Sequence, residues 1–431
     1  MEAPAVPLQA APPLAARLRA LYDRFGRLGV SLADQAGVSA TNFLTGVLIG
    51  RACSPEQLGL YGIGLAVLLI VTEVHQAFVS TPHQVLYPRP PGDAERRRFN
   101  GSALLHSLAI GGIVGVGVLV AALFSGGQTG GVLLALAVAA WAVLARYFAR
   151  LFSFTTLRPA AALWLDGGVA LLQLGGLATL AWTGRLSAMS AFVWIGVSNA
   201  VALIAWLLPL RREFAPAPAA AVGDFKKTWP LSRWVVLSGV TWTLGMHAYP
   251  LLIGGLRTPA EAGVWTACFG IAALANPLLM GIQNWLGPVV AHAAVSRPRP
   301  AFRRLVLRAS LGFGLLMTPV VLGTFLFGDW LVRAYGPEYA THGGLVAMLT
   351  LATLAHAVGF ASARGLFADG RALHDFAGNL VTLALLLTIG LWLVARHGVD
   401  GAAWSFVIGM AAGNAYRVLA FLATSRGEAT S

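Results

Sequence analysis

The chain has 431 residues, of which 57% are hydrophobic and 11% charged, and its formal net charge is +13. Soluble domains carry about 25% charged residues, so this composition excludes an ordinary globular surface in water. The basic residues lie in short clusters between apolar runs, which excludes a nucleic-acid-binding domain, and we expect no nucleic-acid partner.

Twelve apolar runs follow one another along the chain, and each is long enough to cross a hydrocarbon core of ~30 Å as a helix. Backbone groups in lipid must pair within their own segment, and alternating strand patterns are absent, so the sequence predicts an all-α integral membrane protein. The expected transmembrane helices cover residues 29–50, 58–79, 101–124, 131–149, 160–182, 189–210, 231–253, 263–290, 306–327, 342–362, 376–395 and 401–423.

The distribution of Lys and Arg predicts the orientation of these spans. With twelve spans, 25 of the 30 basic side chains fall on the side that holds both termini, and 5 fall on the other side. Positively charged loops are retained in the cytoplasm. We therefore expect a multi-pass protein of a bacterial inner (plasma) membrane with both termini cytoplasmic.

Residues 1–28 are expected to form a cytoplasmic N-terminal segment. Apolar residues recur there at helical spacing with arginines between them, which is typical of an amphipathic helix lying on the membrane surface. A disordered basic lead-in is the alternative. The apolar positions are Leu14, Leu18, Leu21, Phe25 and Leu28.

Residues 211–229 are the longest linker, rich in Ala, Pro and charge, and they divide the chain into an N-terminal lobe (29–210) and a C-terminal lobe (230–431) of six helices each. A motif recurs at an offset of 204 residues, in 49–61 and 253–265. It reads Ile-Gly, three residues, Ser/Thr-Pro, three residues, Gly, one residue, aromatic. Because both copies lie between the first and second helix of their lobe, we expect two lobes related by a pseudo-twofold along the membrane normal.

Known catalytic motifs and metal-ligand spacings are absent from the sequence, so we predict no enzyme activity, no catalytic residues, no cofactor and no metal site. Polar residues inside spans are costly in lipid and usually face a cavity or another helix. The predicted cavity-lining residues are Asp34, Gln35, Asn42, Glu73, Gln76, Arg233, His247, Asn276, Gln283 and Asn284.

These residues fall on the first two helices of each lobe, so two facing polar stripes would enclose a central cavity. Alternatives remain open for each group. Asp34 could instead be solvated near the interface or paired with an Arg, and Glu73 and Gln76 could belong to an interfacial cluster. The stripes of the second half could serve ordinary interhelical hydrogen bonds. Pro277 is expected to kink its helix.

Three stretches, residues 31–67, 328–340 and 398–404, resemble the polysaccharide-export flippases of the multidrug/oligosaccharidyl-lipid/polysaccharide exporter superfamily. The resemblance implies a flippase that moves a polyprenyl-pyrophosphate-linked oligosaccharide to the outer leaflet by alternating access. Its partners would be that lipid-linked glycan, membrane lipids, and a glycan polymerase or other export components. Arginine forks suit phosphate, and candidate headgroup contacts are Arg89, Arg146, Arg364 and Arg417; the alternative is that they only set topology.

Two other functions are compatible with the sequence. A cation-coupled multidrug exporter of the same superfamily would use Asp34, Glu73 and Asp166 as ion or cation sites. A non-transporting membrane scaffold of a glycan synthesis complex would use none of the polar stripes. A net positive cavity would favour the flippase, and deep carboxylates without cationic partners would favour the drug exporter.

Overall fold

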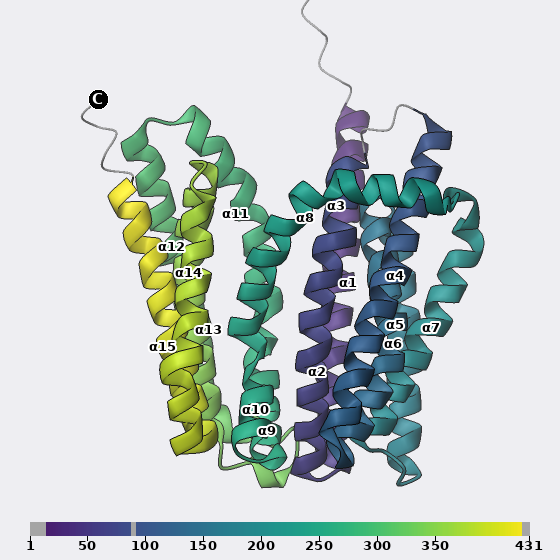
Figure 1. The fold of residues 1–431 in the computed structure, drawn as a ribbon. Helices are drawn as coiled ribbons and strands as arrows, with labels where there is room; N and C mark the ends of the chain where they lie inside the picture. Colours follow the sequence, from purple (N-terminus) through teal and green to yellow (C-terminus); the bar gives the residue numbers. More distant parts are fainter. Residues whose placement is uncertain (1–13, 88–91, 425–431) are drawn as a thin grey trace, which may run out of the picture.

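The computed structural model of the protein describes residues 14–87 and 92–424; for residues 14–25, 27, 28, 31, 32, 281–285 and 288 it describes the backbone alone. Over the described ranges the chain is helical, with no strand. Figure 1 shows two bundles of helices side by side, one from each half of the chain.

The N-terminal lobe consists of seven α-helices, a π-helical turn inside its second span, and a 3-10 turn at its end. In chain order its elements are α1 (Leu14–Ala52), α2 (Pro55–His75), η1 (Gln76–Ser80), α3 (Thr81–Leu86), α4 (Asp93–Ser125), α5 (Gly127–Thr155), α6 (Pro159–Trp182), α7 (Ala188–Leu210) and η2 (Arg211–Glu213).

The C-terminal lobe is more broken than the first. Its elements are α8 (Pro218–His247), α9 (Tyr249–Leu256), α10 (Pro259–Ala272), η3 (Ala273–Ala275), α11 (Asn276–Ser296), α12 (Arg299–Val332), η4 (Pro337–Tyr339), α13 (Gly343–Ala368), α14 (Ala372–Leu385), η5 (Leu386–Gly390) and α15 (Leu391–Thr424).

The predicted all-α membrane fold of about twelve spans in two six-helix lobes is confirmed. By length and hydropathy, nine helices among the described residues qualify as spans, or ten with the bent pair α8 and α9. Two further passes complete the twelve. The polar helix α1 is one of them, and the other appears when the stretch 372–424 is divided at Gly398, whose backbone leaves the helical region (φ 57°, ψ −134°).

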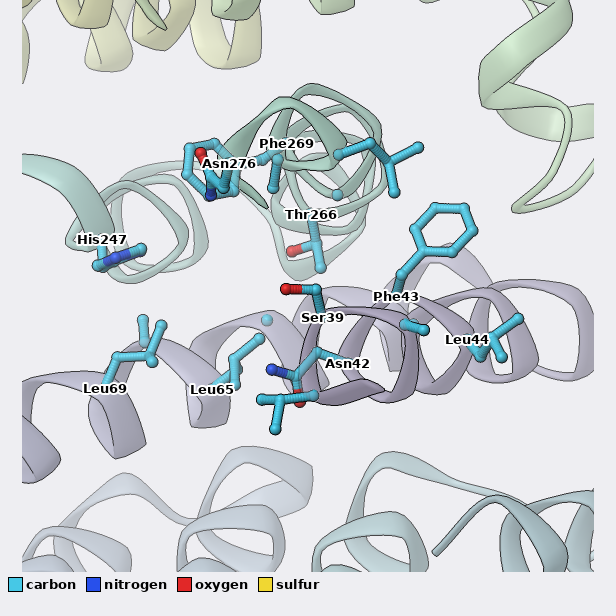
Figure 2. Close-up of a pocket in the computed structure, with 18 of the residues that line it drawn as sticks. Ser39, Asn42, Phe43, Leu44, Leu65, Leu69, His247, Thr266, Phe269 and Asn276 are labelled. Atoms are coloured by element: carbon cyan, nitrogen blue, oxygen red, sulfur yellow. The ribbon is translucent and has the colours of Figure 1, made fainter. Parts of the chain in front are cut away.

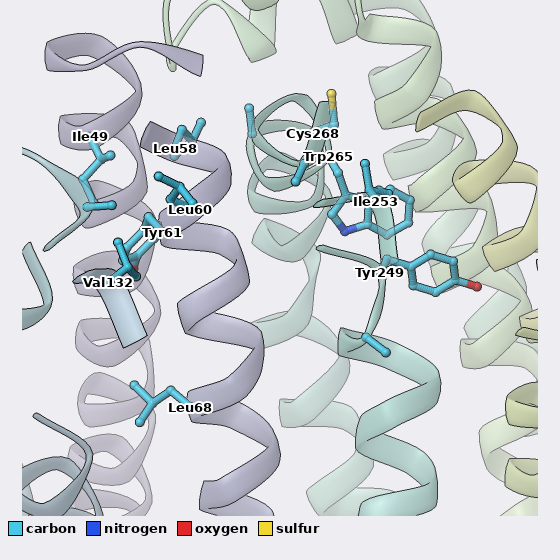
Figure 3. Close-up of a cluster of buried hydrophobic side chains, with 14 of the residues drawn as sticks. Ile49, Leu58, Leu60, Tyr61, Leu68, Val132, Tyr249, Ile253, Trp265 and Cys268 are labelled. Atoms are coloured by element: carbon cyan, nitrogen blue, oxygen red, sulfur yellow. The ribbon is translucent and has the colours of Figure 1, made fainter. Parts of the chain in front are cut away.

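The largest hydrophobic core that the two lobes share among the described residues lies at one end of the molecule. The largest cluster of buried side chains joins residues of both halves, and Figure 3 shows Tyr61 of α2 and Trp265 of α10 within it. Two smaller clusters each belong to one lobe: Phe152 and Trp206 lie in the N-terminal one, and Phe302 lies in the C-terminal one. The lobes are therefore fused near the α1–α2 and α9–α10 connections, and each has its own core farther away.

The repeated motif is the point where the lobes cross. A Cβ added at Gly59 would lie 1.6 Å from the carbonyl oxygen of Pro259, and one added at Gly263 would lie 2.1 Å from the carbonyl oxygen of Pro55. The two contacts are reciprocal, as a pseudo-twofold requires. Both glycines are needed because any side chain there would hold α2 and α10 apart. Thr258 caps α10, whereas Ser54 makes no side-chain cap.

The structure differs from the sequence-based expectation in the linker. Helix α8 begins at Pro218, so the second part of the expected linker 211–229 is helical. This part packs on the N-terminal lobe, where Asp224 Oδ2 accepts a hydrogen bond from Ser102 Oγ at 2.8 Å and Trp229 stacks on Phe78. Figure 1 shows α8 starting above the N-terminal lobe before it enters the other lobe.

The N-terminal segment also differs from expectation. Residues 14–28 continue into the first span as one 39-residue helix, α1, rather than forming a separate surface helix. At 1.5 Å per residue such a helix is about 58 Å long, well beyond the hydrocarbon core. Its first turns therefore project past the apolar layer. Residues 1–13 lie outside the described part of the chain.

Candidate functional site

A cavity of about 590 Å³ lies between the two lobes, lined by α1 and α2 on one side and by α8–α11 on the other. Figure 2 shows Asn42 and Ser39 of α1 facing Thr266 and Asn276 of the opposite lobe across it. None of the described side chains that line it is charged. Its polar lining residues include Gln35, Ser39, Asn42, Tyr61, His247, Thr266, Asn276 and Tyr335.

The cavity lies where both C-lobe helices that line it are interrupted. Helices α8 and α9 meet at a 52° bend just after His247, and Pro250 follows in the first turn of α9. The next span passes through the 3-10 turn η3 before α11 starts at Asn276 and Pro277. A Pro removes one helical hydrogen bond and obstructs the preceding turn, which explains both interruptions. The expected kink at Pro277 is therefore present as a change of helix type.

Tyr335 closes the end of the cavity where the lobes are fused. Its ring packs edge-on against Phe43 of α1, with centroids 5.9 Å apart. Its hydroxyl oxygen lies 2.0 Å from where a Cβ of Gly270 would be and 3.0 Å from that of Gly46. Arg51 Nε donates to the neighbouring carbonyl of Ala334 at 2.7 Å. The α12–α13 loop of the C-terminal lobe is thus fastened to α1 of the other lobe.

Asp34 does not line this cavity, because it is part of a buried ion network inside the N-terminal lobe. Arg150 donates from Nη2 to Asp34 Oδ2 at 2.7 Å and from Nε to Asp166 Oδ2 at 2.6 Å. Arg146 donates to Asp166 Oδ1 at 2.6 Å and to Asn199 Oδ1 at 2.9 Å. The alternative in which Asp34 pairs with an Arg is the observed one. Two guanidinium groups balance two carboxylates, so the network is electrically neutral.

The other predicted N-lobe residues divide between the cavity and its surroundings. Gln35 lines the cavity and also accepts a hydrogen bond from Arg150 at 3.2 Å. Gln76 is outside it and accepts from the Tyr147 hydroxyl at 3.0 Å. Glu73 reaches across to α8, where its carboxylate lies against Gly239. Among the residues that the structure describes, the carboxylate of Glu73 makes no hydrogen bond or ion pair.

The predicted C-lobe residues also divide. His247 lines the cavity, with its ring edge-on to Phe269, and Asn276 lines it too. Arg233 lies outside it, exposed, with its guanidinium 5.5 Å from the ring centroid of Trp234. The side chains of Gln283 and Asn284, and the whole of Arg89, lie outside the described residues.

A second, more polar cavity of about 270 Å³ lies inside the C-terminal lobe between α8, α13, α14 and α15. Arg417 lies in its wall and donates to Asp375 Oδ1 at 2.8 Å, to Asn414 Oδ1 at 2.9 Å and to Asn379 Oδ1. Arg364 lies in the same wall, with its guanidinium 4.7 Å from the ring centroid of Phe360. The structure therefore brings together two of the four predicted arginines.

Sequence reasoning missed several lining residues. Thr266 directly follows the aromatic residue of the second repeat motif, and Tyr335 lies in the 328–340 stretch that carries the family resemblance, so both had a positional signal. Phe269 had none, because an aromatic residue in an apolar span looks the same from sequence whether it faces lipid, core or cavity.

Comparison of the sequence with known families matches residues 169–341 to a family described as polysaccharide biosynthesis protein. Two uncharacterised proteins from two strains of Mycobacterium tuberculosis are each 27% identical over 218 residues, which is 48% of this chain and 49% of theirs. The match thus spans about half the length of these curated relatives.

Solved structures match over nearly the whole chain. An inward-facing multidrug resistance transporter of the MATE family superposes with a TM-score of 0.74 at 14% identity, covering 91% of this chain and 96% of that one. The lipid II flippase MurJ in an inward closed conformation gives 0.70 at 12% identity, covering 90% and 86%. An outward-facing MATE transporter gives 0.60 at 14% identity, covering 94% and 96%.

The chain therefore has the fold of these MATE and MurJ transporters. The match of residues 169–341 to the polysaccharide biosynthesis family confirms, together with this fold, the resemblance to the polysaccharide transporters.

Proposed function

We propose that this protein flips a polyprenyl-pyrophosphate-linked oligosaccharide from the cytoplasmic to the outer leaflet of a bacterial inner membrane. The observation that carries the proposal is the central cavity of about 590 Å³ between two pseudosymmetric lobes that are fused at one end. A binding space on the symmetry axis, sealed at one end, is what rocking of one lobe against the other requires.

The orientation of the chain gives this arrangement a direction. Both described chain ends lie at the end of the molecule away from the fused core (Figure 1). With the termini in the cytoplasm, as the distribution of Lys and Arg predicts, the fused end faces outward. The conformation is then the one that accepts substrate from the cytoplasm. The higher TM-score to the inward-facing than to the outward-facing MATE structure, 0.74 against 0.60, agrees with this assignment.

The described lining of the central cavity is uncharged, so the net positive charge that would favour a flippase is not found there. The lining is largely apolar, and its amide, hydroxyl and imidazole groups and aromatic rings such as Phe269 and Trp265 could take sugar hydroxyls and apolar sugar faces. The carboxylates that a cation-coupled exporter would use are largely neutralised, because Asp34 and Asp166 are each paired with a guanidinium. Glu73 is the one of the three candidates without such a partner among the described residues, and it keeps the drug exporter as the second candidate.

The test is a lipid extract from a strain that lacks the gene, analysed by mass spectrometry for polyprenol-linked oligosaccharides. We expect a completed lipid-linked unit to accumulate and surface polysaccharide to be lost, both restored by the wild-type gene. Asn42→Trp, which fills the cavity, should fail to restore them. Leu123→Trp is the matched control, because Leu123 of α4 is 75% exposed on the outer surface of the lobe, and it should restore both.

An unchanged lipid pool with increased sensitivity to cationic dyes would refute the flippase and favour the drug exporter. If Asn42→Trp restored the polysaccharide as well as Leu123→Trp, the cavity would not be the path, and the scaffold hypothesis would gain.

A further inference from the structure

Each lobe contains a cluster in which an Asn of its last helix accepts a hydrogen bond from an Arg. Asn199 of α7 donates from Nδ2 to the carbonyl of Ile195 at 2.8 Å and accepts from Arg146 at 2.9 Å. Asn414 of α15 donates to the carbonyl of Met410 at 2.8 Å and accepts from Arg417 at 2.9 Å. The last helix of each lobe thus binds a guanidinium through an Asn side chain, that of Arg146 from α5 in one lobe and that of Arg417 from α15 itself in the other.

The charge balance of the two clusters differs. In the N-terminal lobe the carboxylates of Asp34 and Asp166 neutralise two guanidinium groups. In the C-terminal lobe the cavity wall contains two guanidinium groups but a single carboxylate, that of Asp375. The offset of 204 that relates the repeat motifs places Ser238 at the position of Asp34. Ser238 lines the C-lobe cavity, so the wall has a hydroxyl where the N-terminal lobe has the carboxylate of Asp34. The described wall residues therefore carry about one net positive charge, and the Glu73 carboxylate lies outside the wall, against Gly239.

Two polar groups of the cavity wall have unused hydrogen-bonding capacity. Arg364 is exposed, and among the described residues its guanidinium makes no hydrogen bond or ion pair and contacts the ring of Phe360. Nδ1 of His356 is buried without a hydrogen-bond partner. Buried polar groups in proteins are nearly always paired, and an exception asks for a ligand or water. The cavity of about 270 Å³ is much larger than the ~30 Å³ that one water molecule occupies.

We propose that this cavity is an oxyanion subsite, which takes a phosphate or diphosphate group where the N-terminal lobe has its own carboxylates. Arg364 would supply a two-pronged fork to the phosphate oxygens, a geometry that guanidinium groups provide and ammonium groups do not. Arg417, already fixed by Asp375, Asn379 and Asn414, adds a permanent positive charge without having to move. The inference rests on the proposed function, because it identifies the ligand as the diphosphate of a lipid-linked substrate.

The position of the subsite fits a substrate that also fills the central cavity. Gly239 and Trp242 of α8 line the subsite, and Met246 of the same helix lines the central cavity. Seven residues along a helix span about 10 Å. The subsite lies on the side of the central cavity away from the fused end, where a headgroup arriving from the cytoplasm would first bind.

Binding of radiolabelled geranylgeranyl diphosphate to the full chain in lipid nanodiscs tests the proposal, with empty nanodiscs subtracted. Arg364→Gln removes the unpaired guanidinium, and Ser238→Asp supplies the carboxylate that the N-terminal lobe has. We expect each to weaken binding about tenfold or more, the effect of losing a hydrogen-bonded charge. Arg308→Gln is the matched control, because Arg308 of α12 is exposed and does not line the cavity. Geranylgeraniol, which lacks the diphosphate, should not compete.

Equal affinity in the wild type, Arg364→Gln and Ser238→Asp would overturn the subsite. Competition by inorganic diphosphate at the same concentration as the lipid would overturn the assignment to a lipid headgroup. Variant-sensitive binding in a protein whose deletion leaves the polyprenol-linked pools unchanged would refute the flippase and leave the subsite standing. A size-exclusion profile identical to that of the wild type shows that each variant is folded.

Discussion

Substitution of Gly59 by Ala should open the fused end of the molecule. The new Cβ would lie 1.6 Å from the carbonyl oxygen of Pro259, whereas contacts between uncharged heavy atoms are comfortable near 3.5–4.0 Å, so α2 and α10 must separate by about 2 Å. The obstacle is backbone on both sides, and no side chain can rotate away. Overpacking of this kind costs about 1–3 kcal/mol. If the protein alternates as proposed, the conformation with this end closed alone bears that cost, because the opposite conformation would separate α2 from α10.

A shift of 1–3 kcal/mol changes the ratio of the two conformations by about 5- to 150-fold. A cysteine placed at Asn42, in a background with Cys53→Ser, reports the change through labelling by a membrane-impermeant maleimide from the outside. We expect labelling to be slow with wild-type Gly59 and to increase severalfold with Gly59→Ala. Gly263→Ala should act in the same way, because its Cβ would lie 2.1 Å from the carbonyl oxygen of Pro55.

Gly117→Ala is the matched control, since Gly117 is also helical and nothing lies within 4 Å of its added Cβ. It should label like the wild type. If Gly59→Ala also labelled like the wild type while remaining folded by size-exclusion chromatography, the crossing of α2 and α10 would not be the seal, and the gating argument would be refuted.

Three further predictions concern the buried ion network, the Tyr335 ring and the Cys53 thiol. Arg150→Met should lower the melting temperature strongly, because it leaves Asp34 and Asp166 buried beside too little positive charge, a loss of about 3–5 kcal/mol of stability. Adding Asp34→Leu should recover part of that stability. No recovery would contradict the pairing of Arg150 with Asp34 at 2.7 Å. Tyr335→Ala should increase outside labelling of the cavity and Tyr335→Phe should not, since the ring fills the gap beside Gly270; equal labelling of both variants would refute a steric plug. Burial raises the pKa of the Cys53 thiol, so less thiolate is present at a given pH. The rate of its reaction with maleimide should therefore increase at a higher pH than that of an exposed cysteine. A pH profile that matches that of free cysteine would contradict the burial.

The polar residues of α1 show how far sequence reasoning reaches at the site. Asn42 and Asp34 are both polar residues of one apolar helix, and the pattern assigned them to one stripe. Eight residues is a little over two turns, so the stripe drifts around the helix. The structure places Asn42 in the cavity and Asp34 against Arg150. Arg150, the partner of Asp34, is 116 residues away in the chain, and a local sequence pattern cannot predict a contact at that separation.

The sequence by itself determined the membrane fold, the number of spans, the two-lobe organisation and the repeat. Each of these follows from local quantities: the length of an apolar run, the charge of a loop, and a motif that recurs at a constant offset. The bilayer imposes these rules because unpaired backbone groups and charges are costly in hydrocarbon.

The tertiary structure alone decided which polar groups neutralise one another and which remain open to a ligand. Arg150 and Arg364 both lie near the ends of apolar helices and look alike in sequence. Arg150 is paired with two carboxylates from other helices, whereas Arg364 contacts a phenyl ring at the edge of a cavity. The difference arises from packing among helices far apart in the chain, because a charge is stabilised or left available by whatever the fold brings within a few ångströms of it.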